Sequence, residues 1–293
     1  MLKILITGAR GQLGQDLSRA LASEAPVALD RDHLDVADLA AVARTVADLR
    51  PDVVLNTAAY NHVDRAEDEP AEAFRVNALG PYALARACEA PGAMLVHFST
   101  DYVFGSGAPT PRLEHDPPSP RGAYAVSKLA GEQLVRAAAS RHMVIRTSGL
   151  YGLHGRGGKG GNFVETMLRL AAERKKIRVV SDQVLAPTFS EDLARKVAEL
   201  LERWGRDRAE SLLGLYHLTS LGSCSWFDFA AEIFRRRRIE ADLEPVSTAE
   251  YGAKAPRPAY SVLAPGHLER LGLEYIRHWR DALGDYLSRR SGT

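Results

Sequence analysis

The sequence predicts an α/β fold, with a doubly wound parallel sheet covered by helices and a smaller C-terminal part. Two observations predict this fold class. Short apolar runs alternate with segments of helical periodicity through the first half of the chain, which is typical of a parallel sheet with crossover helices. A glycine-rich, cationic stretch, 154–161, then interrupts the alternation and marks a boundary between two unequal parts.

Each element follows from its local pattern. Short apolar runs predict buried strands, longer periodic segments predict helices, and Pro51 marks the entry to the third strand. In chain order the first half reads as strand 3–6, helix 14–22, strand 27–29, helix 39–49, strand 53–56, helix 71–90, strand 94–99, helix 123–139 and strand 143–146. The second half reads as helix 163–175, strand 177–180, helix 191–204, strand 215–219, helix 226–237 and a last helical stretch after Pro258.

Composition excludes several classes of protein. Lys plus Arg number 38 against 37 for Asp plus Glu, so the net charge of +1 gives no field that would attract nucleic acid or a membrane surface. The two cysteines lie far apart and the nine histidines show no metal-ligand spacing, so we expect neither a disulfide framework nor a metal site. No apolar stretch approaches the roughly 20 residues of a membrane helix. The first strand runs directly into a glycine turn, which leaves no room for a signal peptide, and we expect a cytoplasmic protein.

The glycine motif that follows the first predicted strand opens the first helix with the spacing GxxGxxG. In this position glycines let backbone amides approach a pyrophosphate, whose charge the helix N-terminus stabilises. The motif predicts a Rossmann-like dinucleotide site of the kind found in extended short-chain dehydrogenases, although a simple tight turn is the alternative. The residues expected at the cofactor here are Gly8, Gly11, Gln12, Leu13 and Gly14.

The end of the second predicted strand carries a candidate for recognition of the adenosine ribose. Asp30 can accept hydrogen bonds from both ribose hydroxyls, and its alternative role is that of a loop or helix-capping aspartate. Arg31 beside it can accommodate a 2′-phosphate, so the cofactor is NADPH or NADH and the choice stays open. Two further stretches resemble cofactor contacts of the same superfamily, and they contain Asp35, Val36, Ala58, Ala59 and Tyr60.

A phenol and an amine, those of Tyr124 and Lys128, stand one helical turn apart on the same face of a predicted helix. A phenol with a pKa of about 10 is a poor proton donor to an alkoxide unless a nearby cation lowers that pKa, and Lys128 can supply the cation. Thr100 ends the fourth strand, at the sheet edge where ligands bind in doubly wound folds. We therefore expect the hydroxyls of Thr100 and Tyr124 to converge on one carbonyl oxygen.

Together with several further stretches, these residues make the chain resemble the dTDP-4-dehydrorhamnose reductases over nearly its whole length. The similar stretches include Gly11-Gln-Leu-Gly14, Asn56-Thr-Ala-Ala-Tyr60, Ser99-Thr-Asp-Tyr-Val-Phe104, Tyr124 to Glu132, Arg146-Thr-Ser148 and Ala186-Pro-Thr188. The resemblance implies an oxidoreductase, a monomer or homodimer, that reduces the 4-keto group of a dTDP-linked 4-keto-6-deoxy sugar. The implied reaction converts dTDP-4-dehydro-L-rhamnose into dTDP-L-rhamnose.

The same resemblance implies a role for each site residue. Thr100 would polarise the ketone and Tyr124 would donate the proton, while Lys128 would lower the pKa of the phenol and hold the nicotinamide ribose. Asp101 and Tyr102 would line the sugar site, and a tyrosine at 102 argues against a dehydratase, which carries an acidic residue there. We expect residues 1–150 plus about 177–220 to form the dinucleotide-binding domain, and about 151–176 and 221–293 to form the substrate-binding part.

The chain also departs from the family. Gly149 replaces a tryptophan that packs on the substrate, and Tyr260 replaces a residue that is usually Asn. The loop 155–161 looks enlarged, so that Arg156 or Lys159 could grip a diphosphate, although a solvated linker is the alternative. Some members dimerise through metal-bridged carboxylates, and Asp16 and Glu191 fall near the corresponding places, but we expect no metal because surface acids are usually solvated.

Two other functions stay open at this point. An epimerase of the same fold would keep the three catalytic residues but recycle its bound cofactor. A non-catalytic cofactor-binding subunit, similar to the regulatory beta subunit of methionine adenosyltransferase, would bind the dinucleotide without turnover.

Overall fold

The computed structural model describes residues 1–105, 107–154, 161–173 and 176–290. Its centre is a six-stranded sheet in the order β10-β5-β4-β3-β1-β2, in which all neighbouring strands are parallel. The strands are β1 Ile4–Thr7, β2 Val27–Leu29, β3 Val53–Asn56, β4 Met94–Thr100, β5 His142–Thr147 and β10 Gly214–His217. The order reverses between β1 and β3, and ligands bind outside the carboxyl ends of strands at such a switch point.

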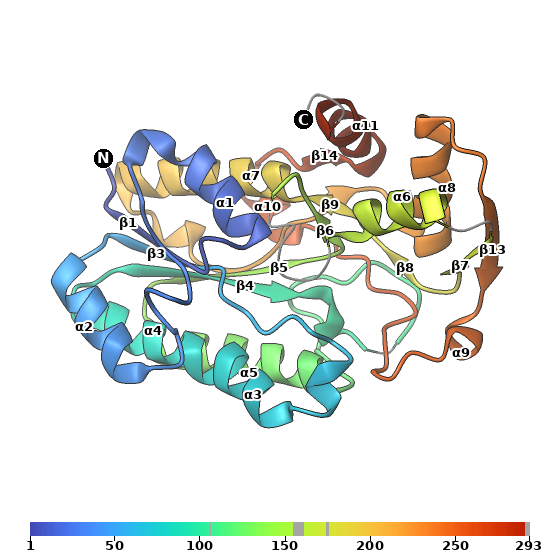
Figure 1. Ribbon diagram of the computed structural model, residues 1–293. Coiled ribbons are helices and arrows are strands. Elements are labelled where there is room, and N and C mark those ends of the chain that lie inside the picture. The colour runs from blue at the N-terminus through green and yellow to red at the C-terminus, as the bar shows by residue number, and fades with distance from the viewer. Residues whose placement is uncertain (106, 155–160, 174–175, 291–293) are drawn as a thin grey trace.

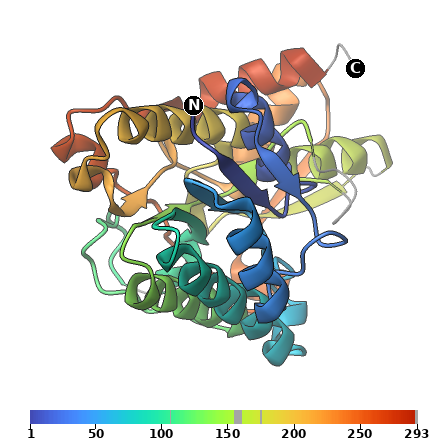
Figure 2. The same ribbon diagram turned by 90° about the vertical axis from the view of Figure 1, so that its left-hand side faces the viewer.

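Helices cover both faces of this sheet, so the predicted doubly wound parallel fold is confirmed (Figures 1 and 2). The helices below the sheet in Figure 1 are α2 Leu39–Leu49, α3 Pro70–Phe74, α4 Gly80–Glu89 and α5 Ala123–Ala138. Those above it include α1 Gln12–Ala20 and α7 Ser190–Asp207. Alternate strand residues such as Ile4 and Leu5 enter different apolar cores, one on each face of the sheet, because successive side chains of a strand point to opposite sides.

One predicted helix, 71–90, is interrupted. A π-helical turn, Arg75–Leu79, separates α3 from α4. The turn brings Asn77 to the backbone of Tyr60, whose amide donates to Asn77 Oδ1 at 2.8 Å and whose carbonyl accepts from Nδ2 at 3.0 Å. The predicted helix 71–90 is therefore present as a helical run from Pro70 to Glu89, and the π-helical turn within it could not be predicted because these bonds link residues far apart in the sequence.

The smaller C-terminal part packs at one end of the sheet around its own aromatic core, which includes Tyr151, Phe189, Phe229 and Trp279 (Figure 1). Its helices are α6 Phe163–Glu173, α8 Trp226–Arg237, α9 Thr248–Tyr251 and α11 Trp279–Arg290. Its strands pair two by two, as β7 Lys176–Val180 with β13 Asp242–Val246, β6 Leu150–Tyr151 with β9 Thr188–Phe189, β8 Val184–Leu185 with β12 Cys224–Ser225, and β11 Ser220–Leu221 with β14 Ile276–His278.

Short helical pieces complete the fold: α10 Gly266–Arg270 and the 3₁₀ turns Ala22–Glu24, Arg65–Glu67, Asp101–Val103 and Glu210–Leu212. The division into a dinucleotide-binding and a substrate-binding part stays a prediction, with one difference in detail. We expected residues from about 177 onward to return to the larger part, whereas β7 pairs with β13 outside the main sheet, and only α7 and β10 join the larger part.

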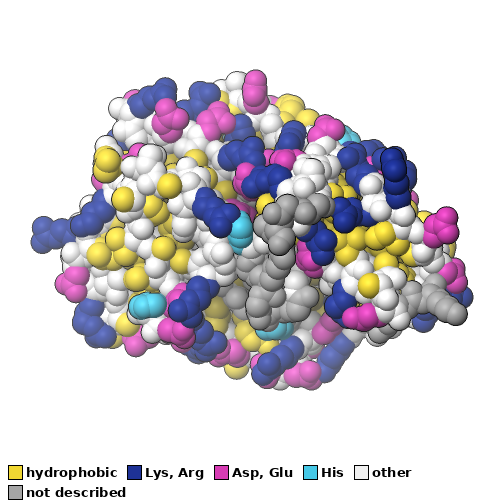
Figure 3. All heavy atoms as spheres, turned by 45° about the horizontal axis from the view of Figure 1, so that its top comes forward, with side chains coloured by type: hydrophobic (Ala, Val, Ile, Leu, Met, Phe, Trp, Pro, Cys, Tyr) yellow, Lys and Arg dark blue, Asp and Glu magenta, His cyan; other side chains and the backbone are white. Residues whose placement is uncertain are grey.

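The described surface agrees with the balanced composition. Basic and acidic side chains are interspersed on the face that Figure 3 shows, so this face presents no continuous field of one sign. Within the described residues, no helix is both long and apolar enough to cross a lipid bilayer.

Candidate active site

A cavity of about 1060 Å³ opens at the carboxyl ends of β1, β3, β4 and β5, and the smaller part forms its far wall. All but one of the residues predicted for the cofactor and the substrate line it. These residues are Gly8, Gly11, Gln12, Leu13, Gly14, Arg31, Asp35, Val36, Ala58, Ala59, Tyr60, Thr100, Asp101, Tyr102, Tyr124 and Lys128. The exception among the predicted residues is Asp30.

The glycine turn brings backbone unusually close to backbone. Gly8 has φ +70, and a Cβ at this position would lie 2.6 Å from the amide nitrogen of Ala58, so no other residue fits without a shift. A Cβ on Gly14 would lie 2.7 Å from the Gly8 carbonyl oxygen. Helix α1 begins at Gln12, and none of the described side chains caps its N-terminus. Its first amides therefore face the cavity as donors suited to an anion.

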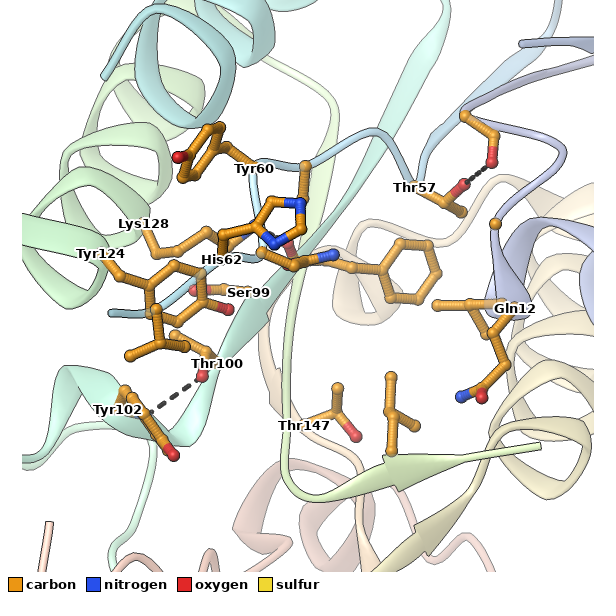
Figure 4. Close-up of a pocket in the computed structure, with 18 of the residues that line it drawn as sticks. Gln12, Thr57, Tyr60, His62, Ser99, Thr100, Tyr102, Tyr124, Lys128 and Thr147 are labelled. Carbon is orange, nitrogen blue, oxygen red and sulfur yellow. Dashed lines mark hydrogen bonds between the residues drawn. The ribbon is translucent and has the colours of Figure 1, made fainter. Parts of the chain in front are cut away.

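The turn after β3 braces the glycine turn from the other side. Thr57 donates from its hydroxyl to the carbonyl of Thr7 at 2.6 Å and to that of Gly8 at 3.2 Å (Figure 4). Tyr60 and His62 follow on the same loop and line the cavity. His62 was missed, because a lone histidine in a loop carries no spacing signal in the sequence.

The carboxylate of Asp30 is fully occupied by neighbouring groups. It forms an ion pair with Arg10, and it accepts from His33 Nδ1 at 2.7 Å and from the amide of Asp32 at 3.0 Å. The hydrogen bond from His33 and the charge of Arg10 hold the pKa of this carboxyl below its usual range. Arg31, by contrast, lines the cavity with a side chain that is 75% exposed.

Tyr124 and Lys128 project from α5 toward Thr100 at the end of β4, and Gln12 lies across the cavity from them (Figure 4). The ring of Tyr124 packs edge-to-face against Tyr102, with 5.9 Å between ring centroids. Burial raises the pKa of the Tyr124 phenol, and the hydrogen bond with Thr100 opposes that shift. A phenol with a raised pKa is protonated at neutral pH, as a proton donor must be.

The amine of Lys128 is hydrogen-bonded to the backbone of β4 in this structure. It donates to the carbonyl of Phe98 at 2.6 Å, and burial lowers its pKa to about 8 while the nearby Glu132 opposes that shift. We expected Lys128 to lower the pKa of Tyr124, whereas the pKa of Tyr124 is raised and Thr100 is the neighbour that lowers it most. The physical reason is that desolvation of the phenol is the largest effect on its pKa, and the nearby Asp101 and Tyr102 raise that pKa further.

Asp101 lines the cavity beside Thr100, although its side chain is almost fully buried. Its carboxylate is 3% exposed and accepts from the hydroxyls of Ser148 at 2.8 Å and Thr100 at 3.2 Å. Burial raises its pKa to about 6, and hydrogen bonds from Ser261 and Ser148 oppose that shift. The amide of Tyr102 donates to Thr100 Oγ1 at 3.2 Å, so the threonine hydroxyl is held from both sides.

A buried ion pair ties α5 to the two central strands beneath the cavity. Glu132 and Arg146 are 0% and 2% exposed, and Arg146 Nη2 donates to Glu132 Oε2 at 2.7 Å. Ser99 donates to the same carboxylate at 2.5 Å. Because Ser99 precedes Thr100 and Glu132 lies one turn after Lys128, this pair fixes the strand and the helix that carry the predicted catalytic groups.

The far wall of the cavity contains residues that the sequence did not reveal. Phe163 and Trp226 line it beside Gly149, which has φ +53. A Cβ at Gly149 would lie 2.6 Å from Leu185 Cδ1, so a tryptophan here would displace the Leu185 side chain and would also be strained by the positive φ. Of the residues near the departure at Tyr260, Pro258 and Ser261 line the cavity, whereas Tyr260 does not.

The two carboxylates considered for a metal-bridged dimer have partners in their own chain. Asp16 is 2% exposed and accepts from the Ser190 hydroxyl at 2.5 Å, so it is not the surface residue that we expected. Glu191 pairs with Arg195 and Arg289. Arg156 and Lys159, the candidates for gripping a diphosphate, lie outside the described residues, as does the rest of 155–160.

The comparisons with known proteins agree with one another. The family model described as RmlD substrate binding domain matches residues 2–291. The spore coat polysaccharide biosynthesis protein SpsK of Bacillus subtilis is 42% identical over 99% of both chains. A dTDP-4-dehydrorhamnose reductase of Streptomyces griseus is 42% identical over 95% of this chain and 91% of its own. The crystal structure of a dTDP-4-dehydrorhamnose reductase of Bacillus anthracis in complex with NADP is 38% identical, covers 98% of this chain and 99% of its own, and has a TM-score of 0.92.

Proposed function

Because the chain belongs to the RmlD substrate binding domain family, we propose that it is an NADPH-dependent dTDP-4-dehydrorhamnose reductase. The proposed reaction reduces the 4-keto group of dTDP-4-dehydro-L-rhamnose and yields dTDP-L-rhamnose. The observation that carries the proposal is that the glycine turn, Thr100, Tyr124 and Lys128 line one cavity. The relatives named as this reductase support the choice of reaction.

The described residues fit a dinucleotide. The glycine turn and the uncapped N-terminus of α1 suit its pyrophosphate, because they present backbone amides without side chains in the way. Lys128 lies on the cavity wall, where its amine can hold the nicotinamide ribose by turning from the carbonyl of Phe98. When bound, the reduced cofactor supplies the hydride that the reaction needs.

The proton comes from Tyr124 in this proposal. The ketone oxygen accepts hydrogen bonds from the hydroxyls of Tyr124 and Thr100, which are already hydrogen-bonded to each other. As negative charge develops on that oxygen, the phenol transfers its proton and the substrate leaves as an alcohol. The Thr100 hydroxyl has one proton, which it donates to Asp101 in this structure, so it turns from Asp101 to the ketone oxygen when the substrate binds.

The surroundings of Asp30 support NADPH as the preferred cofactor. A free carboxylate at the end of β2 would accept hydrogen bonds from the ribose diol of NADH and repel a 2′-phosphate. Asp30 has its oxygens engaged by Arg10 and His33, and the guanidinium of Arg10 offsets its charge. Arg31 lines the cavity beside it, where a guanidinium suits a phosphate.

The test is an assay of absorbance loss at the nicotinamide band with a panel of keto sugar nucleotides and both cofactors. We expect stoichiometric consumption of NADPH with dTDP-4-dehydro-L-rhamnose, and slower consumption of NADH. Net consumption would exclude an epimerase, which recycles its cofactor, and a non-catalytic subunit, which has no turnover. An absence of consumption with every keto sugar, while NADPH binds, would contradict the proposal.

A further inference from the structure

The cavity extends past Thr100 and Tyr124 to an apolar wall made by Phe163 and Trp226. The two rings pack against each other with 4.5 Å between centroids and an interplanar angle of 42°. They come from the first residues of α6 and α8, which are far apart in the sequence. Both side chains are only partly buried, so each keeps surface that is not covered by protein.

The position of Trp226 is fixed from several directions. Ser225 caps α8 in a reciprocal capping box with Asp228, which sets where the helix starts. The two residues before Trp226 form β12, which pairs with β8 along the cavity edge. On its inner side the indole meets the ring of Phe229, with 6.5 Å between centroids. A rigidly held aromatic ring at a cavity wall loses little freedom when a ligand packs on it.

The strand register places this wall close to the reacting groups. Thr147 on β5 is paired with Thr100 on β4, and Gly149 follows two residues later. A Cβ built on Gly149 would lie 3.7 Å from Trp226 Cη2. The indole therefore borders the same cavity as the hydroxyls proposed to bind the ketone.

We propose that Trp226 is the packing surface for the sugar ring of the sugar nucleotide and so contributes to the choice of sugar. This inference rests on the proposed function. A 6-deoxy sugar exposes a methyl group and one face of C–H bonds, and both are stabilised against an indole because they leave water there. Phe163 packs against the indole, and the Leu185 side chain lies between Gly149 and the rest of this wall.

Tryptophan fluorescence offers a direct readout, because the chain has three tryptophans and all lie in the described part. Trp204 and Trp279 are 1% and 0% exposed, and only Trp226 of the three lines the cavity. The wild-type protein is titrated with dTDP and with dTDP-L-rhamnose in the presence of NADP⁺, by fluorescence and by calorimetry. We expect dTDP-L-rhamnose to bind more tightly than dTDP and to change the fluorescence more.

In Trp226→Leu the affinity for dTDP-L-rhamnose should fall about tenfold, since a stacked ring is lost, while the affinity for dTDP should stay the same. Trp226→Phe keeps an aromatic face and should recover most of the loss, which a purely structural role would not explain. Tyr251→Ala, at an exposed aromatic residue on α9 away from the cavity, is the matched control. The unchanged emission of Trp204 and Trp279 reports that the variants fold.

Equal tenfold losses for dTDP and dTDP-L-rhamnose would overturn the inference, because Trp226 would then contact the nucleotide. Unchanged affinities in Trp226→Leu would overturn it as well, and the proposed reductase function would still stand. If the wild-type protein bound neither dTDP nor dTDP-L-rhamnose, the proposed function would fail together with the inference, so the two failures are distinguishable.

Discussion

The two halves of the cavity, one proposed to bind the cofactor (the cofactor half) and the other the substrate (the substrate half), are built in different ways. The cofactor half consists mainly of three strand-to-helix turns within the first 60 residues, and it works through backbone amides and close backbone packing. The substrate half is assembled from side chains of separate segments, around 149, 163, 184, 226 and 260. The geometry of the first half therefore follows from a local sequence pattern. The geometry of the second half follows from the tertiary packing of distant segments.

The largest effect is expected at the junction of the two halves. Tyr124→Phe removes the proton donor but keeps the ring that packs on Tyr102. We expect kcat to fall by about 10²- to 10⁴-fold, the range for loss of a general acid. The Kd for NADPH and for dTDP-L-rhamnose, measured by calorimetry, should stay within about twofold of wild type. Equal turnover in the variant would refute the role assigned to Tyr124.

The second prediction concerns the buried ion pair beneath the junction of the two halves. Glu132→Gln leaves Arg146 buried without its carboxylate, so the free energy of unfolding should fall by about 3–5 kcal/mol in urea titrations. Glu132→Leu combined with Arg146→Met should recover most of this loss, because no unpaired charge is left. The exposed pair Arg169–Glu173 on α6 is the matched control, and Glu173→Gln should cost less than about 1 kcal/mol. Similar losses in Glu132→Gln and Glu173→Gln would contradict this account.

The third prediction concerns a substitution that should change cofactor binding without changing substrate binding. Arg31→Ser should reduce the preference for NADPH over NADH by about tenfold or more, the value of a charge-assisted contact to a phosphate. Its affinity for dTDP-L-rhamnose should not change, because Arg31 lies in the cofactor half. Arg44→Ser, at an exposed arginine on α2, is the control and should change neither affinity. If the NADPH preference survived in Arg31→Ser, the 2′-phosphate would have to bind elsewhere.

The smallest expected effect is on the pH profile. The pKa of Lys128 is lowered to about 8, so its ammonium form is present below that pH and is lost as the pH rises through it. Turnover in the direction of ketone reduction should therefore decline above about pH 8, approaching tenfold per pH unit. Lys128→Met should be slower at every pH and lack this alkaline decline. A wild-type profile that stays flat to about pH 9.5 would show that the charge of Lys128 is not needed.

The sequence predicted the fold well where an element depends on its own residues. The segments 27–29, 39–49, 53–56 and 226–237 match β2, α2, β3 and α8 residue for residue. The two-residue strands of the smaller part could not be predicted, because their pairing depends on partners far along the chain. The same reason explains the π-helical turn at Asn77, whose side chain accepts a hydrogen bond from the loop after β3.

The residues of the candidate site also fall into two groups: those that a local pattern predicts and those whose contacts depend on packing. Gly8 and Gly14 could be found because their spacing itself reports close backbone contact. Asp30 was located correctly at the end of β2, but its pairing with Arg10 and His33 depends on side-chain directions that the sequence does not carry. Trp226 gave no signal, since a tryptophan at the start of a helix is usually part of a core.

The most direct test of the account follows a label from the cofactor half to the substrate half. The protein is given dTDP-4-dehydro-L-rhamnose and NADPH that carries two deuterium atoms at C4 of the nicotinamide, and the product is analysed by NMR and mass spectrometry. The account predicts one deuterium at C4 of the sugar for each NADPH oxidised. A sugar product without deuterium, formed with no net oxidation of NADPH, would contradict it.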